Sequence, residues 1–329
     1  MMTLNYAEKS VIRLECDMTF TTVKVFPRFK KSIGARSTVG RKGRRDWIGI
    51  PFCLPYIVVF LFGTIIPLFY ALYLGLYKQQ MIGGSSFVGL ANYVKALSDT
   101  LMWTSYGRVF LYFWIQTPLM LILSLVAALI LDSQRIRHVA IPRMLLFLPY
   151  AVPGVIAAMM WGYIYGDDYG LVGQLFHVFG TQAPNLFSGR LMLFAIANIA
   201  TWGFMGYNML ICYSSLRVIP EELYESARID GASEFRIAWS IKIPQIRDSL
   251  MMMLLFSLIG SFQLFNEPSI LKTLAPETIN SSYTPNIYTY SLAFTSQDAN
   301  YAAAVSLVVG VITMVLVGIV KSIGDREGK

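Results

Sequence analysis

The stretch YESARIDGASEFRIAWSIKIP, residues 224–244, is a charged segment that lies between two long apolar runs. Just before it, Pro220 can begin a helix, and Glu221 and Glu222 then occupy the first turn, where the helix dipole favours carboxylates. Gly231 can end that helix, because glycine readily takes the left-handed conformation that follows a last helical turn. The first half of the stretch therefore predicts a short charged helix and a tight turn.

The second half of the stretch predicts another short helix with an aromatic face. Ser233 is a suitable N-cap, and Phe235 and Trp239 lie four residues apart and so share a face. Pro244 is expected to close this helix just before the next apolar run. Such a helix pair can lie flat on a membrane surface, or it can dock into the groove of a partner protein. The pattern alone favours neither interpretation.

The composition around this stretch is that of a membrane protein. Of 329 residues, 55% are hydrophobic and only 14% are charged, with 21 Phe, 19 Tyr and 16 Met. A helix needs about 20 apolar residues to cross a bilayer, at about 1.5 Å of rise per residue. Six runs meet this requirement: 47–77, 108–131, 142–165, 190–212, 249–271 and 301–320. We therefore predict an all-α, polytopic membrane protein with six transmembrane helices.

The basic residues predict the orientation of these helices. Most of the 27 lysines and arginines precede residue 47, follow residue 320, or lie between the second and third or the fourth and fifth runs. This asymmetry predicts that both termini are cytoplasmic. The net charge of +8 then faces anionic lipid, and nucleic-acid binding is not needed to explain it. The predicted parts are a basic arm (1–46), a membrane domain (47–321) that includes the cytoplasmic segment 219–246, and a cytoplasmic tail (322–329).

Several classes of chemistry have no support in the sequence. The three cysteines are too few and too scattered for a disulfide framework, and His138 and His177 are far apart, so we expect neither a metal site nor a catalytic residue. An intramembrane enzyme would need a base or a metal cluster, and no convincing one is evident. The phosphate-binding pattern G-x-x-x-x-G-K-[ST] does not occur, so this chain is expected to bind no cofactor of its own and to depend on another chain for ATP.

Segment 219–246 resembles the conserved cytoplasmic loop of the permeases of bacterial ABC importers. The pattern of that loop is Glu-Ala-Ala, three residues, Gly, nine residues, Ile, any residue, Leu, Pro. The matching positions in this chain are Glu225, Ser226, Ala227, Gly231, Ile241, Ile243 and Pro244. The spacing is complete, and the two departures, Ser226 for alanine and Ile243 for leucine, are conservative.

Other segments are similar to the sugar-permease branch of that family, the maltose and multiple-sugar type. They are FVGLANY at 87–93, LPYAVP at 148–153, IDGA at 229–232 and YAAA at 301–304. The resemblance runs from about residue 46 to the end and does not cover the basic arm. It implies the fold of a type I ABC importer permease in the bacterial cytoplasmic (inner) membrane.

The resemblance implies that segment 219–246 forms the coupling helices, which dock on a separate ATPase. The residues it marks for coupling are Glu225, Ala227, Asp230, Gly231, Phe235 and Pro244. The implied partners are a second, homologous permease subunit, two copies of the ATPase, which carries ATP and Mg, and an extracytoplasmic solute-binding protein. The implied substrate is an oligosaccharide or a related carbohydrate. The chain is also expected to contact the surrounding membrane lipid.

Polar residues in the fourth and fifth apolar runs are candidates for substrate binding. Such residues are costly in hydrocarbon, and a sugar needs aromatic faces together with hydroxyl and amide partners. The candidates are Asn198, Trp202, Tyr207, Asn208, Ser261 and Gln263. In maltose-type permeases the sugar site involves these same two runs, and the resemblance matches best at Trp202, Tyr207 and Ser261. Hydrogen bonding between helices is the alternative explanation for each polar residue.

An ion-coupled secondary transporter is the main alternative function. That mechanism usually needs an ionisable residue deep in the membrane. The one internal candidate in the apolar runs is Glu267, roughly 28 Å along an outward-running helix and so expected near the outer interface. The sequence therefore favours an ATP-driven importer.

Overall fold

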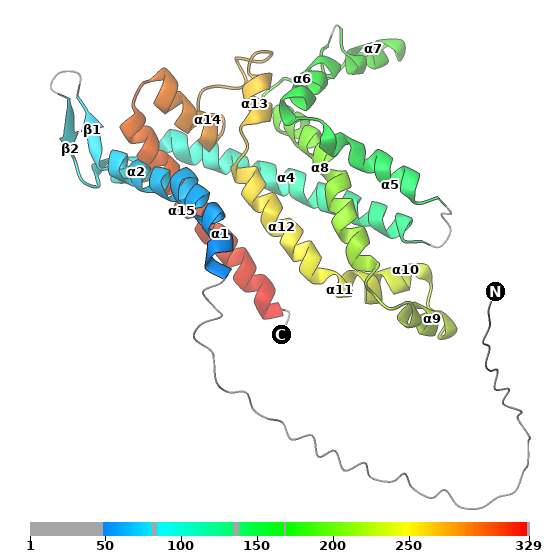
Figure 1. Ribbon diagram of the computed structural model, residues 1–329. Helices are drawn as coiled ribbons and strands as arrows, with labels where there is room; N and C mark the ends of the chain where they lie inside the picture. The colour runs from blue at the N-terminus through cyan, green and yellow to red at the C-terminus, as the bar shows by residue number, and fades with distance from the viewer. Residues whose placement is uncertain (1–48, 81–83, 134–137, 168, 328–329) are drawn as a thin grey trace, which may run out of the picture. The chain divides into compact units, whose positions relative to one another are not determined.

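The computed structural model describes residues 49–80, 84–133, 138–167 and 169–327 (Figure 1). The predicted basic arm (1–46), Arg135, Arg137 and the last two residues of the tail lie outside this part of the chain. The chain divides into two compact units, 1–58 and 59–329. Of the first unit, the described residues form the beginning of one apolar helix.

The described chain is largely helical, as predicted. Its long apolar segments are α1 (Gly49–Phe60) with η2 (Leu61–Ile65) and α2 (Ile66–Gly75), α4 (Thr100–Leu131), α5 (Ala140–Phe147) with η3 (Leu148–Ala151) and α6 (Gly154–Ile164), α8 (Met192–Leu216), α12 (Arg247–Phe262) with α13 (Asn266–Leu271), and α15 (Ala299–Glu327). By length and apolarity four of these segments can cross a membrane, and the bent α5–α6 pair makes a fifth. Helix α8 is long enough, but its asparagines lower its hydropathy, so the count of six stays a prediction.

Shorter elements fill the connections between the long helices. The connection after α2 holds an antiparallel hairpin of β1 (Tyr77–Gln79) and β2 (Ser85–Phe87), which the all-α prediction did not include. Other connections hold α3 (Ala91–Leu97), α7 (Leu171–Val178), α14 (Pro285–Tyr290) and η5 (Ser291–Thr295). The segment between α8 and α12 holds α9 (Glu221–Ile229), α10 (Glu234–Ile237), η4 (Ala238–Lys242) and α11 (Ile243–Gln245). The sequence predicts two short helices and a turn here, and the structure agrees in outline.

Helix α4 is the central element of the second unit. It packs along α8 and against α12, while α15 packs against α2, α3 and α12. Figure 1 shows α4 running between α8 and α12. The buried side chains form three apolar clusters, and α4 contributes to each, with Tyr112 in the first, Val109 in the second and Ala128 in the third. Any movement of α4 therefore changes the packing in all three clusters.

Two of the predicted spans are interrupted. Between α5 and α6 the chain bends by 96°, with Pro149 in η3 and Pro153 as the N-cap of α6. Proline lacks an amide hydrogen and its ring clashes with the preceding turn, so two prolines this close together favour a bend here. Helix α12 ends at Phe262, and α13 begins only at Asn266. Irregular backbone at membrane depth is tolerated where protein or a cavity surrounds it.

A close contact between backbones fixes α8 against α5. A Cβ atom added at Gly206 of α8 would collide with the backbone carbonyl of Leu146 on α5. By contrast, a Cβ atom at Gly203, one turn earlier on α8, would meet no atom within 4 Å. Small residues allow membrane helices to approach this closely. Gly206 thus sets the distance between these two helices.

Candidate functional site

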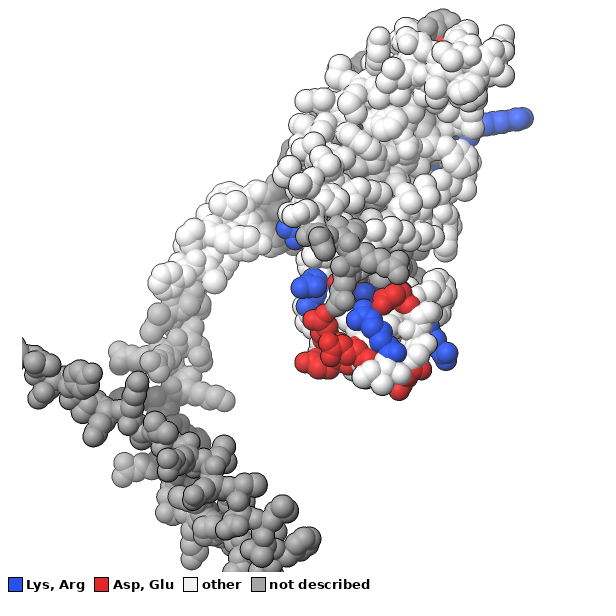
Figure 2. All heavy atoms as spheres, turned by 90° about the vertical axis from the view of Figure 1, so that its right-hand side faces the viewer, with Lys and Arg blue, Asp and Glu red and all other residues white. Residues whose placement is uncertain are grey.

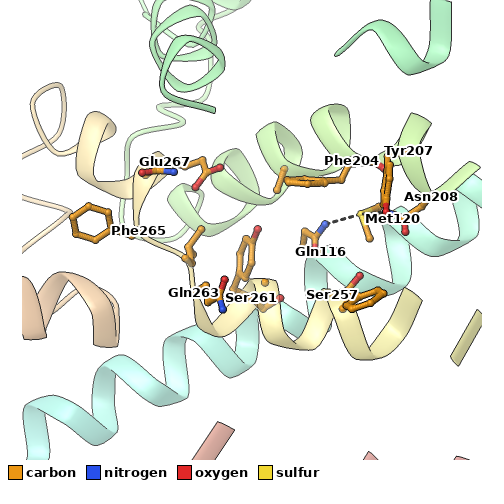
Figure 3. Close-up of a pocket in the computed structure, with 16 residues that line it drawn as sticks. Gln116, Met120, Phe204, Tyr207, Asn208, Ser257, Ser261, Gln263, Phe265 and Glu267 are labelled. Atoms are coloured by element: carbon orange, nitrogen blue, oxygen red, sulfur yellow. Dashed lines mark hydrogen bonds between the residues drawn. The ribbon is translucent and has the colours of Figure 1, made fainter. Parts of the chain in front are cut away.

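A pocket of about 430 Å³ opens among α4, α8, α12 and the start of α13 (Figure 3). Its lining is a mixture of aromatic rings, amides, hydroxyls and one carboxylate. The lining residues are Tyr112, Gln116, Met120, Ala200, Phe204, Tyr207, Asn208, Phe256, Ser257, Gly260, Ser261, Gln263, Leu264, Phe265, Asn266 and Glu267. Pockets for small ligands commonly combine an apolar lining with a few convergent polar groups, and this one has both.

Several polar groups of the pocket are held by neighbouring residues. The Gln116 amide donates to Met120 Sδ at 3.2 Å, and the Asn208 amide donates to the Phe204 carbonyl oxygen at 3.0 Å. The hydroxyl of Ser261 is buried and has no hydrogen-bond partner among the described residues. A buried hydroxyl without a partner is costly, so a ligand that reached Ser261 would satisfy it.

An aromatic wall forms one side of the pocket. The ring of Tyr207 stacks on that of Tyr150, with centroids 4.8 Å apart and an interplanar angle of 16°. Tyr150 belongs to η3, and it also meets Phe204 edge to face at 5.8 Å. Tyr207 remains 37% exposed, so its ring is available to a ligand. The bend at η3 thus positions a second ring behind the one that faces the pocket.

Glu267 lines the pocket, a role that the sequence analysis did not give it. Counting residues along one continuous helix predicts a place near the outer interface, and that depth stays a prediction. The structure adds that the helix is interrupted before Glu267, because α12 ends at Phe262 and α13 begins only at Asn266. Among the described lining residues none is lysine, arginine or histidine, so the pocket carries a single acidic group and no basic one.

Four of the six predicted substrate residues meet in this pocket. Tyr207 and Asn208 come from α8, Ser261 comes from α12, and Gln263 comes from the break that follows α12. In Figure 3 these side chains converge on one space with Gln116 of α4. Whether they bind a substrate stays a prediction.

The other two predicted residues lie outside the pocket lining. Trp202 packs edge to face against Trp161, with centroids 5.8 Å apart, and the Asn198 amide donates to the Tyr165 hydroxyl at 2.8 Å. Both belong to the face of α8 opposite the one that carries Ala200 and its neighbours in the pocket, because two residues advance a helix by about half a turn. Polar residues within an apolar run can be identified from the sequence, but their direction around the helix depends on how that helix packs.

The contribution of α4 was missed altogether. Tyr112, Gln116 and Met120 line the pocket, although the sequence analysis sought polar residues only in the fourth and fifth apolar runs. A signal was present, since Gln116 and Thr117 are adjacent polar residues inside a long apolar run, directly before Pro118. Polar residues at such depth mark internal hydrogen bonds or a pathway.

The second candidate site is the segment 219–246, here called the docking loop. Helix α9 begins at Glu221, one position later than predicted, and Pro220 is its N-cap. Gly231 has a φ of +80° after α9, and the hydroxyl of Ser233 accepts from the amide of Arg236 at 3.3 Å as the cap of α10. These features agree with the predicted helix, turn and helix.

Pro244 does not end the second helix, contrary to the sequence prediction. The helix widens into the π turn η4, and Pro244 lies at the beginning of α11, which runs from Ile243 to Gln245. At the first positions of a helix the missing amide hydrogen of proline costs nothing, and the wider turn before it accommodates the ring. The break comes two residues later, at Ile246, before α12 begins at Arg247.

The docking loop presents an aromatic pair and a charged rim. Phe235 and Trp239 stack at 6.5 Å and are 78% and 67% exposed. They line a groove of about 1010 Å³ whose other wall is formed by the final turns of α4, from Ile122 to Ile130, and by Ser133 just after that helix. Figure 2 shows acidic and basic side chains gathered on the docking loop, whereas most of the other surface in this view carries no charged side chains. An exposed aromatic centre with a polar rim is the composition of a protein interface.

The six predicted coupling residues are mostly on the surface of this loop. Glu225, Asp230, Gly231, Phe235 and Pro244 are exposed, and Ala227 is half-buried. They are thus accessible to a partner, and their role in coupling stays a prediction.

Comparison with known proteins gives a consistent result. Residues 120–327 match the family model described as "Binding-protein-dependent transport system inner membrane component". The trehalose/maltose transport system permease protein of Thermococcus litoralis is 28% identical over 83% of this chain and 92% of its own length. The arabinooligosaccharides transport system permease protein of Bacillus subtilis is 28% identical over 90% of this chain and 93% of its own length.

A solved structure shares the fold. A chain of the bacterial alginate ABC transporter, in complex with an alginate pentasaccharide-bound periplasmic protein, superposes with a TM-score of 0.75. The alignment covers 87% of this chain and 96% of that chain, at 18% identity. The fold of an ABC importer permease therefore extends over most of the sequence.

Proposed function

The chain belongs to the family of binding-protein-dependent transport system inner membrane components, and from this premise we propose that it is the membrane-spanning permease subunit of an ATP-driven carbohydrate importer. It is a multi-pass membrane protein and a transport subunit. The observation that carries the proposal is the pairing of a polar and aromatic pocket along α4, α8 and α12 with an exposed docking loop that joins α8 to α12.

The pocket supports an oligosaccharide or a related carbohydrate as the substrate. Sugars present apolar ring faces and many hydroxyl groups, which suit stacking on aromatic rings and hydrogen bonding to amides and hydroxyls. Tyr207 offers a ring, Asn208 and Gln263 offer amides, and Ser261 offers a free hydroxyl. The relatives named for trehalose, maltose and arabinooligosaccharides add to this argument.

The docking loop supports dependence on a separate ATPase. The chain contains no phosphate-binding loop of the Walker type, so the energy of ATP must enter through a contact. We infer that Glu225 and Gly231, with Ala227, Asp230, Phe235 and Pro244, make that contact, and that ATP and Mg are bound by two copies of the ATPase. The other proposed partners are a second, homologous permease and an extracytoplasmic solute-binding protein. The basic residues favour cytoplasmic termini.

The proposal is tested with the complete transporter, co-expressed with its ATPase, the second permease and the binding protein, and reconstituted in vesicles. We expect uptake of a labelled oligosaccharide that requires both ATP and the binding protein, and that falls at least tenfold for Gly231→Leu or Glu225→Ala. Lys78→Met, a loss of charge at an exposed site on β1, serves as the control.

The ion-coupled alternative predicts a different result in the same vesicles. Uptake would then continue without the ATPase and would stop when ionophores collapse the ion gradients. Full transport by the chain without any ATPase subunit would refute the proposed function. Family membership weighs against this alternative.

A further inference from the structure

A buried ion pair joins the docking loop to α4. Lys242 Nζ lies 2.5 Å from Asp132 Oδ2, and the two side chains are only 7% and 5% exposed. Asp132 directly follows Leu131, the last residue of α4, and Lys242 is the last residue of η4. The pair therefore connects the second half of the docking loop to the end of the central helix.

The surroundings of this pair bring a third element to the same point. The ring of Tyr224, on α9, lies 4.9 Å from Lys242 Nζ, at cation–π distance. Tyr224 is buried, and burial together with the nearby charge of Asp132 raises the pKa of Tyr224 to about 12, so the phenol stays neutral. Both short helices of the docking loop thus contact the pair. Apolar packing continues beside it, where Leu131 and Ile246 belong to one cluster.

The other ion pair of the docking loop differs in burial and in span. Arg228 Nε lies 2.9 Å from Glu234 Oε1, but these side chains are 35% and 57% exposed, and both belong to the loop itself. An exposed pair contributes little to stability, whereas the loss of one member of a buried pair leaves an uncompensated charge. The Lys242–Asp132 pair, in contrast, joins the loop to the end of α4, outside the loop.

Helix α4 continues from this pair to the pocket. Met120 lines the pocket, and Asp132 lies about 18 Å further along the helix at 1.5 Å per residue. The intervening residues include neither proline nor glycine, so this part of α4 has no kink site of those kinds. A displacement of Asp132 is therefore carried to Met120, at the edge of the pocket, with little loss.

We propose that the Lys242–Asp132 pair is the positioning link through which a movement of the docking loop reaches α4 and thereby the pocket. Two atoms held by an ion pair in a buried site keep their relative position, whereas apolar surfaces in contact can slide past each other. This inference rests on the proposed function, because it requires that the loop docks on a moving ATPase.

The test uses the complete reconstituted transporter and compares two quantities: ATP hydrolysis stimulated by the loaded binding protein, and substrate molecules transported per ATP. We expect Lys242→Met and Asp132→Asn to assemble with all partners and to hydrolyse ATP, but to transport at least tenfold less substrate per ATP. The reversed pair, Asp132→Lys with Lys242→Asp, is expected to recover most of the loss. Lys78→Met is the control for the loss of one positive charge.

The outcomes separate the link from a purely structural role. A wild-type ratio of substrate to ATP in both single variants would overturn the link. If the single variants and the reversed pair do not assemble, the double variant Asp132→Leu with Lys242→Met, which leaves no buried charge, decides the matter. A reduced ratio in that variant supports the link, and a wild-type ratio overturns it. Failure of the wild-type complex to transport at all would instead refute the proposed function.

Discussion

Glu267 is the acidic residue among the described residues that line the pocket. A carboxylate accepts strong hydrogen bonds from hydroxyl groups and repels other carboxylates, and no basic side chain in the described lining offsets it. At the scale of the residue, the pocket therefore suits a neutral saccharide better than an acidic one.

This preference predicts the effect of Glu267→Gln. Glutamine replaces a charged hydrogen bond worth about 1.5–3 kcal/mol by a neutral one worth about 0.5–1.5 kcal/mol, so transport efficiency for a neutral oligosaccharide should fall about tenfold. Discrimination against an acidic oligosaccharide should fall as well. Uptake kinetics with both sugars would measure this, with Glu277→Gln, an exposed site outside the pocket, as the control. Unchanged efficiency for both sugars would argue against a role for Glu267.

Ser261 predicts opposite effects on stability and on transport. Its buried hydroxyl has no partner, so Ser261→Ala should leave the melting temperature unchanged or raise it, while uptake declines. Ser124 is a matched comparison on α4, because its hydroxyl donates to the carbonyl oxygens of Met120 and Met205 at 2.7 and 3.0 Å. Ser124→Ala should lower the melting temperature. Thermal unfolding in detergent would measure both, and a large drop for Ser261→Ala would show a hidden partner.

At the scale of the element, the contact between α8 and α5 gives a sharp contrast. Gly206→Ala forces a Cβ atom into the Leu146 carbonyl, which is backbone and cannot rotate away, so we expect a loss of about 1–3 kcal/mol or more. Gly203→Ala on the same helix meets open space, and alanine favours helices over glycine by about 1 kcal/mol. Melting temperatures of the two variants should therefore shift in opposite directions. Equal shifts would contradict the close approach of the two helices.

The start of α4 gives a prediction that depends on pH. Asp99 accepts from the amide of Leu101 at 2.9 Å and from the hydroxyls of Tyr288 and Tyr301, each at 2.6 Å. Burial alone would raise the pKa of Asp99, but these hydrogen bonds outweigh it and hold the pKa below its ordinary value. A lowered pKa means that the charged carboxylate stabilises the fold at neutral pH and that this stabilisation is lost as pH falls through the folded-state pKa.

Asp99→Asn isolates the charge, because asparagine is also a good N-cap. We expect the wild type to melt at a higher temperature than Asp99→Asn from pH 7 down to about 5. The difference should shrink below about pH 4, where the unfolded carboxylate protonates. Melting curves across this range would measure it, and a difference that grows on acidification would have the wrong sign.

At the scale of the whole molecule, the sequence was sufficient for the helical class and for the outline of the docking loop. The length of an apolar run and the glycine at position 231 are local features, which can be identified from consecutive residues in the sequence. The direction of Trp202 and the inclusion of Gln116 and Glu267 could not be obtained in this way. They depend on rotation about a helix axis and on a break after Phe262, both of which are settled by packing against other helices.

The sequence analysis did not predict the hairpin of β1 and β2, nor that the helix continues past Pro244, and the reasons are related. Three-residue strands are too short to show an alternating pattern, and they exist because Tyr77 pairs with Phe87 across the turn. Pro244 reads as a helix terminator unless the preceding turn is known to be wide. The rule that proline ends a helix fails where a wider preceding turn removes the clash between the proline ring and the backbone.

We expect the stacked rings of Phe235 and Trp239 to shorten the lifetime of an unassembled copy of the chain. Proteases and chaperones of the cell recognise exposed apolar side chains, and these two rings are 78% and 67% exposed. A copy made in excess of its partners should therefore be degraded, whereas an assembled copy hides the signal. The abundance of the complete machine would then follow its scarcest component, with no dedicated regulator.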